Sequence, residues 1–185
     1  MARARLSEMD DLARRLADGM HPTDWADRFD AILFEGHTQA WVLGRQRAGD
    51  LALRDVLDEI MGLEAKDRQA DFLQGFLDDV LRGRYLTEDN EYSVPAIRAR
   101  SRMYVRRMRG TANEAFVEAG DGAELYEWRL GPTEHCGDCV QLAALGPYQK
   151  DTMISFPGDG QTDCLINCAC RLVRASDGIS GFDRV

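Results

Sequence analysis

The sequence predicts an α+β protein with an N-terminal helical region, a long central helix and a small cysteine-rich β module. Three observations lead to this class. Apolar residues recur at helical spacing through most of the first 120 residues. A short alternation of apolar and polar residues then indicates a strand. All five cysteines follow that strand, in the last third of the 185-residue chain.

The predicted domain boundaries follow these changes of pattern. Residues 1–92 form a helical region expected to serve in docking, and residues 93–121 form a long arginine-rich helix. Residues 122–176 form the cysteine-rich module, and residues 177–185 form a tail.

Four amphipathic helices are predicted in the helical region. The first covers residues 3–18, and the second runs from an N-cap at Thr23 to about Arg47. Two more are expected between residues 51 and 84, divided around residues 62–67. Both should pack their apolar faces inward and leave acidic faces outside. The apolar face of the first of these two consists of Leu53, Val56, Leu57, Ile60 and Met61.

The long central helix begins at a clear signal, because Ser93 offers an N-cap and Pro95 fits the first turn. It can continue to about Ala119, where Gly120 and the residues after it stop it. The strand signal then covers residues 124–130.

Arginines at helical spacing form a basic stripe on this helix. We prefer to interpret the stripe as a solvated face balanced by the acidic helices, with contact to an acidic partner protein or to nucleic-acid phosphate as the alternative. The net charge of −9 argues against non-specific nucleic-acid binding by the whole chain. The stripe consists of Arg98, Arg102, Arg106 and Arg109.

The cysteines are spaced as two groups that could hold one metal ion. Cys136 and Cys139 form a Cys-x-x-Cys turn, and 24 residues separate Cys139 from the group of Cys164, Cys168 and Cys170. Zinc takes four thiolate or imidazole ligands, and a structural zinc site stabilises a small fold directly. Cys136, Cys139 and Cys168 are the firmest candidate ligands. Cys164 and Cys170 compete for the fourth place, and the adjacent His135 is a sixth candidate.

Other interpretations of the cysteines compete with zinc. The thiols could pack as small apolar groups. A thioredoxin-type redox role needs the first cysteine at a helix N-terminus in a βαβ unit and leaves three cysteines unexplained. A zinc deaminase needs a His-x-Glu and Pro-Cys-x-x-Cys pattern that this chain lacks. With no other catalytic motif in the sequence, we expect a protein that is not an enzyme and has no small-molecule substrate.

The cellular setting is predicted from segments that the sequence lacks. It has no run of 18 apolar residues and no signal-type N-terminus. We therefore expect no contact with a membrane, and a soluble protein in a reducing cytoplasm.

The chain resembles the tailed-phage head morphogenesis proteins, the Mu F-like minor head proteins, chiefly over residues 100 to 174. Cys136, Cys139, Cys168 and Cys170 match the family's cysteine pattern. Cys164 is an additional cysteine, and Ala169 stands where the family has a basic residue. The resemblance rests on Arg102-Met103-Tyr104, Asn113, Tyr126-Glu127-Trp128, Cys136-x-x-Cys139, Pro157-Gly158-Asp159-Gly160, Thr162 and Cys164-x-x-Asn167-Cys168-x-Cys170-x-Leu172.

The resemblance implies a minor head protein that acts in capsid assembly and in DNA packaging or delivery. Its partners would be the portal and the major capsid or scaffold proteins, with contact to DNA left open. It would reside inside the capsid, and in the host cytoplasm during assembly. No catalytic residue is implied. The alternative function is a zinc-ribbon nucleic-acid-binding or regulatory protein that uses the arginine-rich helix, and a steep salt dependence of binding would distinguish it.

Overall fold

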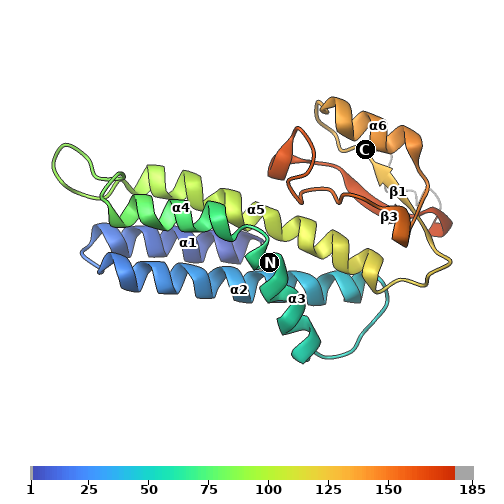
Figure 1. Ribbon diagram of the computed structural model, residues 1–185, viewed down its shortest axis with the longest axis horizontal. Helices are drawn as coiled ribbons and strands as arrows, with labels where there is room; N and C mark the ends of the chain where they lie inside the picture. The colour runs from blue at the N-terminus through green and yellow to red at the C-terminus, as the bar shows by residue number, and fades with distance from the viewer. Residues whose placement is uncertain (1, 178–185) are drawn as a thin grey trace. The chain divides into compact units, whose positions relative to one another are not determined.

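A computed structural model of the chain describes residues 2–177, with six α-helices and a small three-stranded sheet among them (Figure 1). The predicted α+β class is confirmed, with the sheet and the cysteines near the C-terminal end. All but the first residue of the predicted tail lies outside the described residues. The chain divides into two compact units. The first comprises the residues up to Ala40 and Arg54–Met108, and the second comprises Trp41–Leu53 and the residues from Arg109 onward.

The first unit has an aromatic core, and α3 runs across the direction of its other helices (Figure 1). Trp25 and Phe29 lie on one helix and contact Phe76 on another, with ring centroids 5.6 and 5.5 Å apart. Tyr104 stacks on Phe76 at 5.8 Å. Edge-to-face and offset contacts of this kind add to the free energy gained by burying the rings. The helices are α1 (Ala2–Ala17), α2 (Pro22–Arg47) as far as Ala40, α3 (Val56–Asp67), α4 (Ala70–Leu81) and α5 (Val94–Glu118) as far as Met108.

The predicted break within residues 62–67 is wrong, because α3 continues unbroken to Asp67. Gly62 is buried in the middle of that helix. A Cβ atom there would lie 2.3 Å from Thr38 Oγ1 and 2.6 Å from Thr38 Cα. Glycine therefore permits a close approach of α3 to α2 and does not end the helix.

The predicted inward face of α3 is also wrong. The residues that α3 buries are Asp58, Gly62 and Ala65. Val56, Leu57 and Ile60 lie on the exposed side instead. Apolar periodicity identified the helix but not the direction in which it packs.

The sheet of the second unit is antiparallel with strand order β2-β1-β3. β1 (Leu125–Arg129) agrees with the predicted strand and pairs with β3 (Arg171–Arg174), which places Trp128 opposite Leu172. β2 (Tyr148–Gln149) was not predicted, because it is only two residues long.

The core of the second unit combines aromatic residues with cysteines. Phe116 from the end of α5 packs edge-to-face on Tyr126 of β1, with ring centroids 5.5 Å apart. Tyr126 Oη also donates to Glu124 at 2.9 Å, and burial together with this bond raises the pKa of Tyr126 to about 12. Cys139, Cys168 and Cys170 belong to the same buried cluster. The cysteine site is thus part of the core that holds the sheet.

Candidate metal centre

Cys136 and Cys139 are placed by the start of a helix and not by a free loop. Cys136 is the N-cap of α6 (Gly137–Leu145), and Cys139 lies in its first turn. The predicted Cys-x-x-Cys turn is therefore the first turn of a helix. Successive turns of a helix repeat after 3.6 residues, so this spacing brings both side chains to the same side of the helix end.

The remaining three cysteines come from the segment that leads into β3. Cys164 directly precedes a single turn of 3-10 helix, Leu165–Asn167. Cys168 and Cys170 follow that turn, and both are buried. The segment that closes the sheet therefore also delivers these thiols to the core.

The five sulfur atoms gather around Cys139. Its Sγ lies 3.5 Å from Cys164 Sγ and 3.6 Å from Cys168 Sγ. Two groups of three have all their sulfurs within 4.8 Å of one another, Cys136/Cys139/Cys164 and Cys139/Cys168/Cys170. Cys139 is the member that both groups share.

These spacings suit a tetrahedral thiolate site. With metal–sulfur bonds of about 2.3 Å, neighbouring sulfurs of a tetrahedron lie about 3.8 Å apart. The two closest distances to Cys139 fall slightly below that value. A donor set of thiolates selects soft or borderline ions such as zinc over magnesium or calcium. The cluster could therefore hold a metal ion.

The protonation of the thiols depends on their neighbours. Burial would raise the pKa of Cys136, but hydrogen bonds from the backbone and side chains of Cys139 and Cys164 outweigh it and lower that pKa. Burial raises the pKa of Cys168 to about 12, although a backbone hydrogen bond from Cys170 opposes the rise. Burial also raises the pKa of Cys139 far above its usual range. A bound cation would supply the positive charge that a thiolate at Cys139 requires.

His135, a sequence candidate, lies beside Cys170. Its Nδ1 is 3.6 Å from Cys170 Sγ, and its Nε2 is 2.9 Å from the carbonyl oxygen of Gly131. Because a carbonyl only accepts, Nε2 carries the hydrogen and Nδ1 is the acceptor in the neutral ring. A histidine bound in this way can serve as a ligand or as a support for the Cys170 thiol.

The long helix supports the loop that carries the last two cysteines. Arg109 Nη1 donates to the carbonyl oxygen of Cys168 at 2.7 Å, and Nη2 donates to Ala169 at 3.1 Å and to Cys170. Its position in the sequence places Arg109 only in the basic stripe. Spacing on its own helix carries no signal for an acceptor some sixty residues away.

The same helix also positions the glycine turn that precedes the cysteines. Asn113 Nδ2 donates to the carbonyl oxygen of Pro157 at 2.8 Å. A Cβ atom on Gly110 would lie 2.6 Å from the backbone of Asp159. Asp159 accepts hydrogen bonds from the backbone nitrogens of Phe156 at 2.7 Å and Gln161 at 2.8 Å. The backbone of this turn is thus bound both by Asn113 of α5 and by the side chain of its own Asp159.

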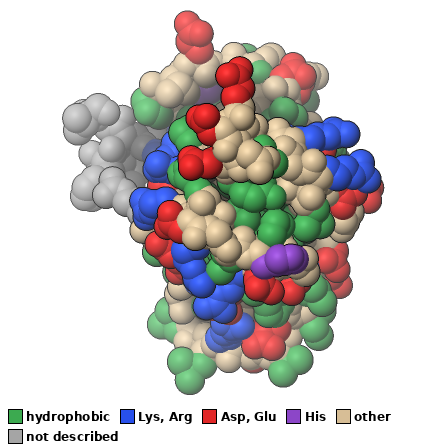
Figure 2. Space-filling view, turned by 90° about the vertical axis from the view of Figure 1, so that its left-hand side faces the viewer, with side chains coloured by type: hydrophobic (Ala, Val, Ile, Leu, Met, Phe, Trp, Pro, Cys, Tyr) green, Lys and Arg blue, Asp and Glu red, His purple; other side chains and the backbone are tan. Residues whose placement is uncertain are grey.

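The other arginines of the stripe have partners within the chain. Arg98 pairs with Asp10 of α1 and lowers the pKa of that carboxyl group, and Arg102 Nη2 lies 3.8 Å from Asp10. Arg106 also has an interaction within the chain. On the face shown in Figure 2, Lys and Arg side chains lie beside Asp and Glu side chains. Contact of the stripe with a partner or with phosphate stays a prediction.

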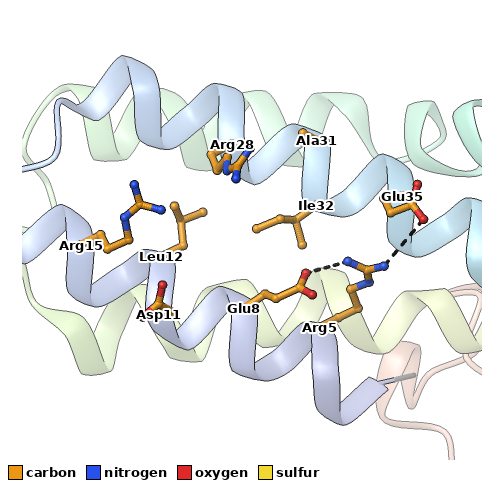
Figure 3. Close-up of a pocket in the computed structure, with 9 residues that line it drawn as sticks. All are labelled: Arg5, Glu8, Asp11, Leu12, Arg15, Arg28, Ala31, Ile32 and Glu35. Atoms are coloured by element: carbon orange, nitrogen blue, oxygen red, sulfur yellow. Dashed lines mark hydrogen bonds and ion pairs between the residues drawn. The ribbon is translucent and has the colours of Figure 1, made fainter.

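A groove of about 360 Å³ in the first unit is lined by residues of α1 and α2 (Figure 3). Arg5 bridges Glu8 at 2.7 Å and Glu35 at 3.8 Å across it. Arg15 and Arg28 also line it, beside a floor that includes Leu12. Basic and acidic groups are mixed in the lining, so it does not favour a ligand of one charge.

Comparison with known proteins places the chain in no group, since no family model, characterised protein or solved structure matches it. Among the residues that the structure describes, no helix is both long and apolar enough to cross a bilayer. The fold and the site define the class: a mixed protein with a helical unit and a sheet unit built around a cysteine cluster.

Proposed function

We propose that this chain is a structural protein of phage head assembly, of the minor head type. The observation that carries the proposal is that separate motifs of the resemblance contact one another in the second unit. Asn113 on the long helix binds the Pro157 turn, and Arg109 beside it binds the backbone of the cysteine loop. Motifs far apart in the sequence therefore serve one compact module.

The proposed cofactor is a structural zinc ion at the cysteine cluster. Support comes from the thiolate donor set, from sulfur distances near those of a tetrahedron and from the burial of Cys139, Cys168 and Cys170. The zinc would be bound mainly by groups withdrawn from solvent. Such a site stabilises the fold and leaves no open position for a substrate, which supports a role without catalysis.

In the proposed role the chain associates with the portal and with major capsid or scaffold proteins, and it resides inside the capsid. The runner-up function, nucleic-acid binding through the arginine stripe, has weaker support. Arg98 and Arg109 already bind Asp10 and backbone carbonyls within the chain, so their guanidinium groups are partly satisfied.

Two measurements test the proposal. Elemental analysis of the reduced protein should find about one zinc per chain. Heads assembled from the genome that encodes the chain should contain it in a few copies, together with the portal. Heads that lack the chain and still assemble and package DNA normally would refute the role in assembly.

A DNA-binding measurement distinguishes the nucleic-acid-binding function from the role in head assembly. Binding of a labelled DNA duplex should be weak at both 50 and 200 mM salt if the chain is an assembly protein. Tight binding at the lower concentration that falls steeply at the higher one would favour the nucleic-acid function.

A further inference from the structure

α3 is held in the first unit by its small and polar residues. Gly62 lies against the backbone of Thr38, as described above. Lys66 Nζ binds Asp30 Oδ1 of α2 at 2.8 Å. At the start of the helix, Asp55 and Asp58 form a reciprocal capping box, with Asp58 fully buried. The packing of α3 on α2 therefore uses few large apolar side chains.

The large apolar side chains of α3 face solvent. Val56, Leu57, Ile60 and Leu63, here called the α3 stripe, are 71, 58, 48 and 44% exposed. Val56, Ile60 and Leu63 are spaced at i, i+4 and i+7, which places them in one row along the helix. An amphipathic helix normally turns such a row toward the core, so α3 is reversed.

Because the α3 stripe is exposed, it lowers the solubility of the chain and adds little to the free energy of folding. Exposed apolar side chains in a contiguous row mark interaction sites more often than chance surface residues. The spacing equals that of helices that insert into an apolar groove of a partner protein. The stripe is therefore suited to be the inserted element, and the groove belongs to the partner.

Charge around the stripe indicates the chemistry of that partner. Glu59, Glu64 and Asp67 flank the row on the same exposed side of the helix. Lys66 Nζ lies 2.8 Å from Asp30 Oδ1 and 3.8 Å from Asp67 Oδ1. Arg54 Nη2 lies 3.2 Å from Glu59 Oε1. The four acidic residues of α3 still outnumber these two bases, and this excess of negative charge favours a groove bordered by lysine or arginine. Two copies of the chain would bring acidic edges together, and the net charge of −9 opposes that pairing further.

We infer that the α3 stripe is a docking surface that inserts into an apolar, basic-edged groove on a partner protein. The inference rests on the proposed function, since it names the surface by which the chain attaches to a head protein. The probe is the portal protein encoded in the same genome.

The test compares the wild-type protein with Ile60→Glu/Leu63→Glu in binding to the purified portal protein. Both positions are exposed, so the variant should keep the unfolding midpoint and zinc content of the wild type. Binding should fall at least thirtyfold. A matched control is Leu81→Glu/Met103→Glu, which adds the same charge at two other exposed apolar positions and should bind like the wild type. Glu64→Lys should weaken binding severalfold, and added salt should weaken wild-type binding.

The possible results distinguish failure of the α3 docking surface from failure of the proposed role in head assembly. Equal portal binding by the wild type and the stripe variant would overturn the α3 docking surface and leave the assembly role standing. No binding by folded, zinc-loaded wild type would overturn the assembly role and this docking partner together. A wild-type dimer in sedimentation that the stripe variant abolishes would overturn the inference by showing that a second copy occupies the stripe.

Discussion

Arg109 Nη1 donates a hydrogen bond to the carbonyl oxygen of Cys168 at 2.7 Å, which ties the long helix to the cysteine loop. The same guanidinium group also binds the carbonyls of Ala169 and Cys170. Three consecutive carbonyls are therefore oriented by one side chain. This contact fixes the backbone between two candidate ligands without using either sulfur.

Replacing Arg109 by methionine should loosen this loop. The unfolding free energy should fall by about 1–2 kcal/mol, since hydrogen bonds from a charged group are lost but water partly replaces them. Zinc transfer to a chelator should become faster. The control Arg102→Met loses only a 3.8 Å contact with Asp10 and should change stability by less than about 0.5 kcal/mol. Equal effects of the two substitutions in urea unfolding would contradict the role given to Arg109.

Removal of the metal should affect the two units differently. Chelation of the proposed zinc ion would leave like-charged or protonated thiols around Cys139, so the second unit should lose its packing. Hydrogen exchange should speed up in β1 and β3, while the amides of α1 and α4 keep their protection. Cys139→Ser should have the same effect, because Cys139 belongs to both groups of sulfurs. Unchanged exchange in the strands after complete zinc removal would show that the metal does not hold the sheet.

Gly62 and Gly75 should respond in opposite directions to alanine. In Gly62→Ala the new methyl group would meet the backbone of Thr38, so we expect a loss of about 1–3 kcal/mol in spite of the better helix propensity. Gly75 also lies within a helix, but a Cβ atom there meets nothing within 4 Å. Gly75→Ala should therefore stabilise the protein by about 0.5–1 kcal/mol. Thermal unfolding of the two variants measures both signs, and a stable Gly62→Ala protein would refute the close contact of α3 with α2.

His37 should make the stability of the first unit depend on pH. Burial, with repulsion from Arg107, Arg68 and Lys66, lowers its pKa from 6.5 to about 3. Below pH 6.5 the unfolded chain binds a proton at His37 that the folded chain excludes. The contribution of the neutral His37 to the unfolding free energy is therefore complete above pH 6.5 and is lost as the pH falls toward 3. By pH 5 the loss should reach about 2 kcal/mol.

The measurement is urea unfolding at pH 7 and pH 5 for the wild type and His37→Gln. The variant should lack this part of the pH dependence, whatever its stability at pH 7. His37 Nε2 lies 2.8 Å from Gln69 Nε2, so the contact itself also changes in the variant. For each protein, the comparison therefore uses the difference in unfolding free energy between pH 7 and pH 5. An identical difference for both proteins would show that His37 takes up a proton in the folded state.

Local pattern predicted most of the secondary structure for a simple reason. The start of α5 at Val94 follows from Ser93 and Pro95, and its end at Glu118 follows from the glycines after it. Strand β1 follows from alternation over a few residues. Signals of this kind act between near neighbours, so the sequence carries them directly. β2 has only two residues and is defined by pairing with β1, so no local pattern marks it.

The sequence alone determined the helical region, the long helix, the strand that precedes the cysteines and the presence of two cysteine groups with metal-ligand spacing. Only the tertiary structure decided which faces those elements bury and which cysteines meet. Cys139 became the centre of the cluster because the pairing of β1 with β3 and the start of α6 bring separate segments together. α3 turned its small residues inward because Gly62 permits close contact with Thr38. Which face an element buries and which cysteines meet depend on residues that are distant along the chain. Short-range periodicity carries no information about those residues.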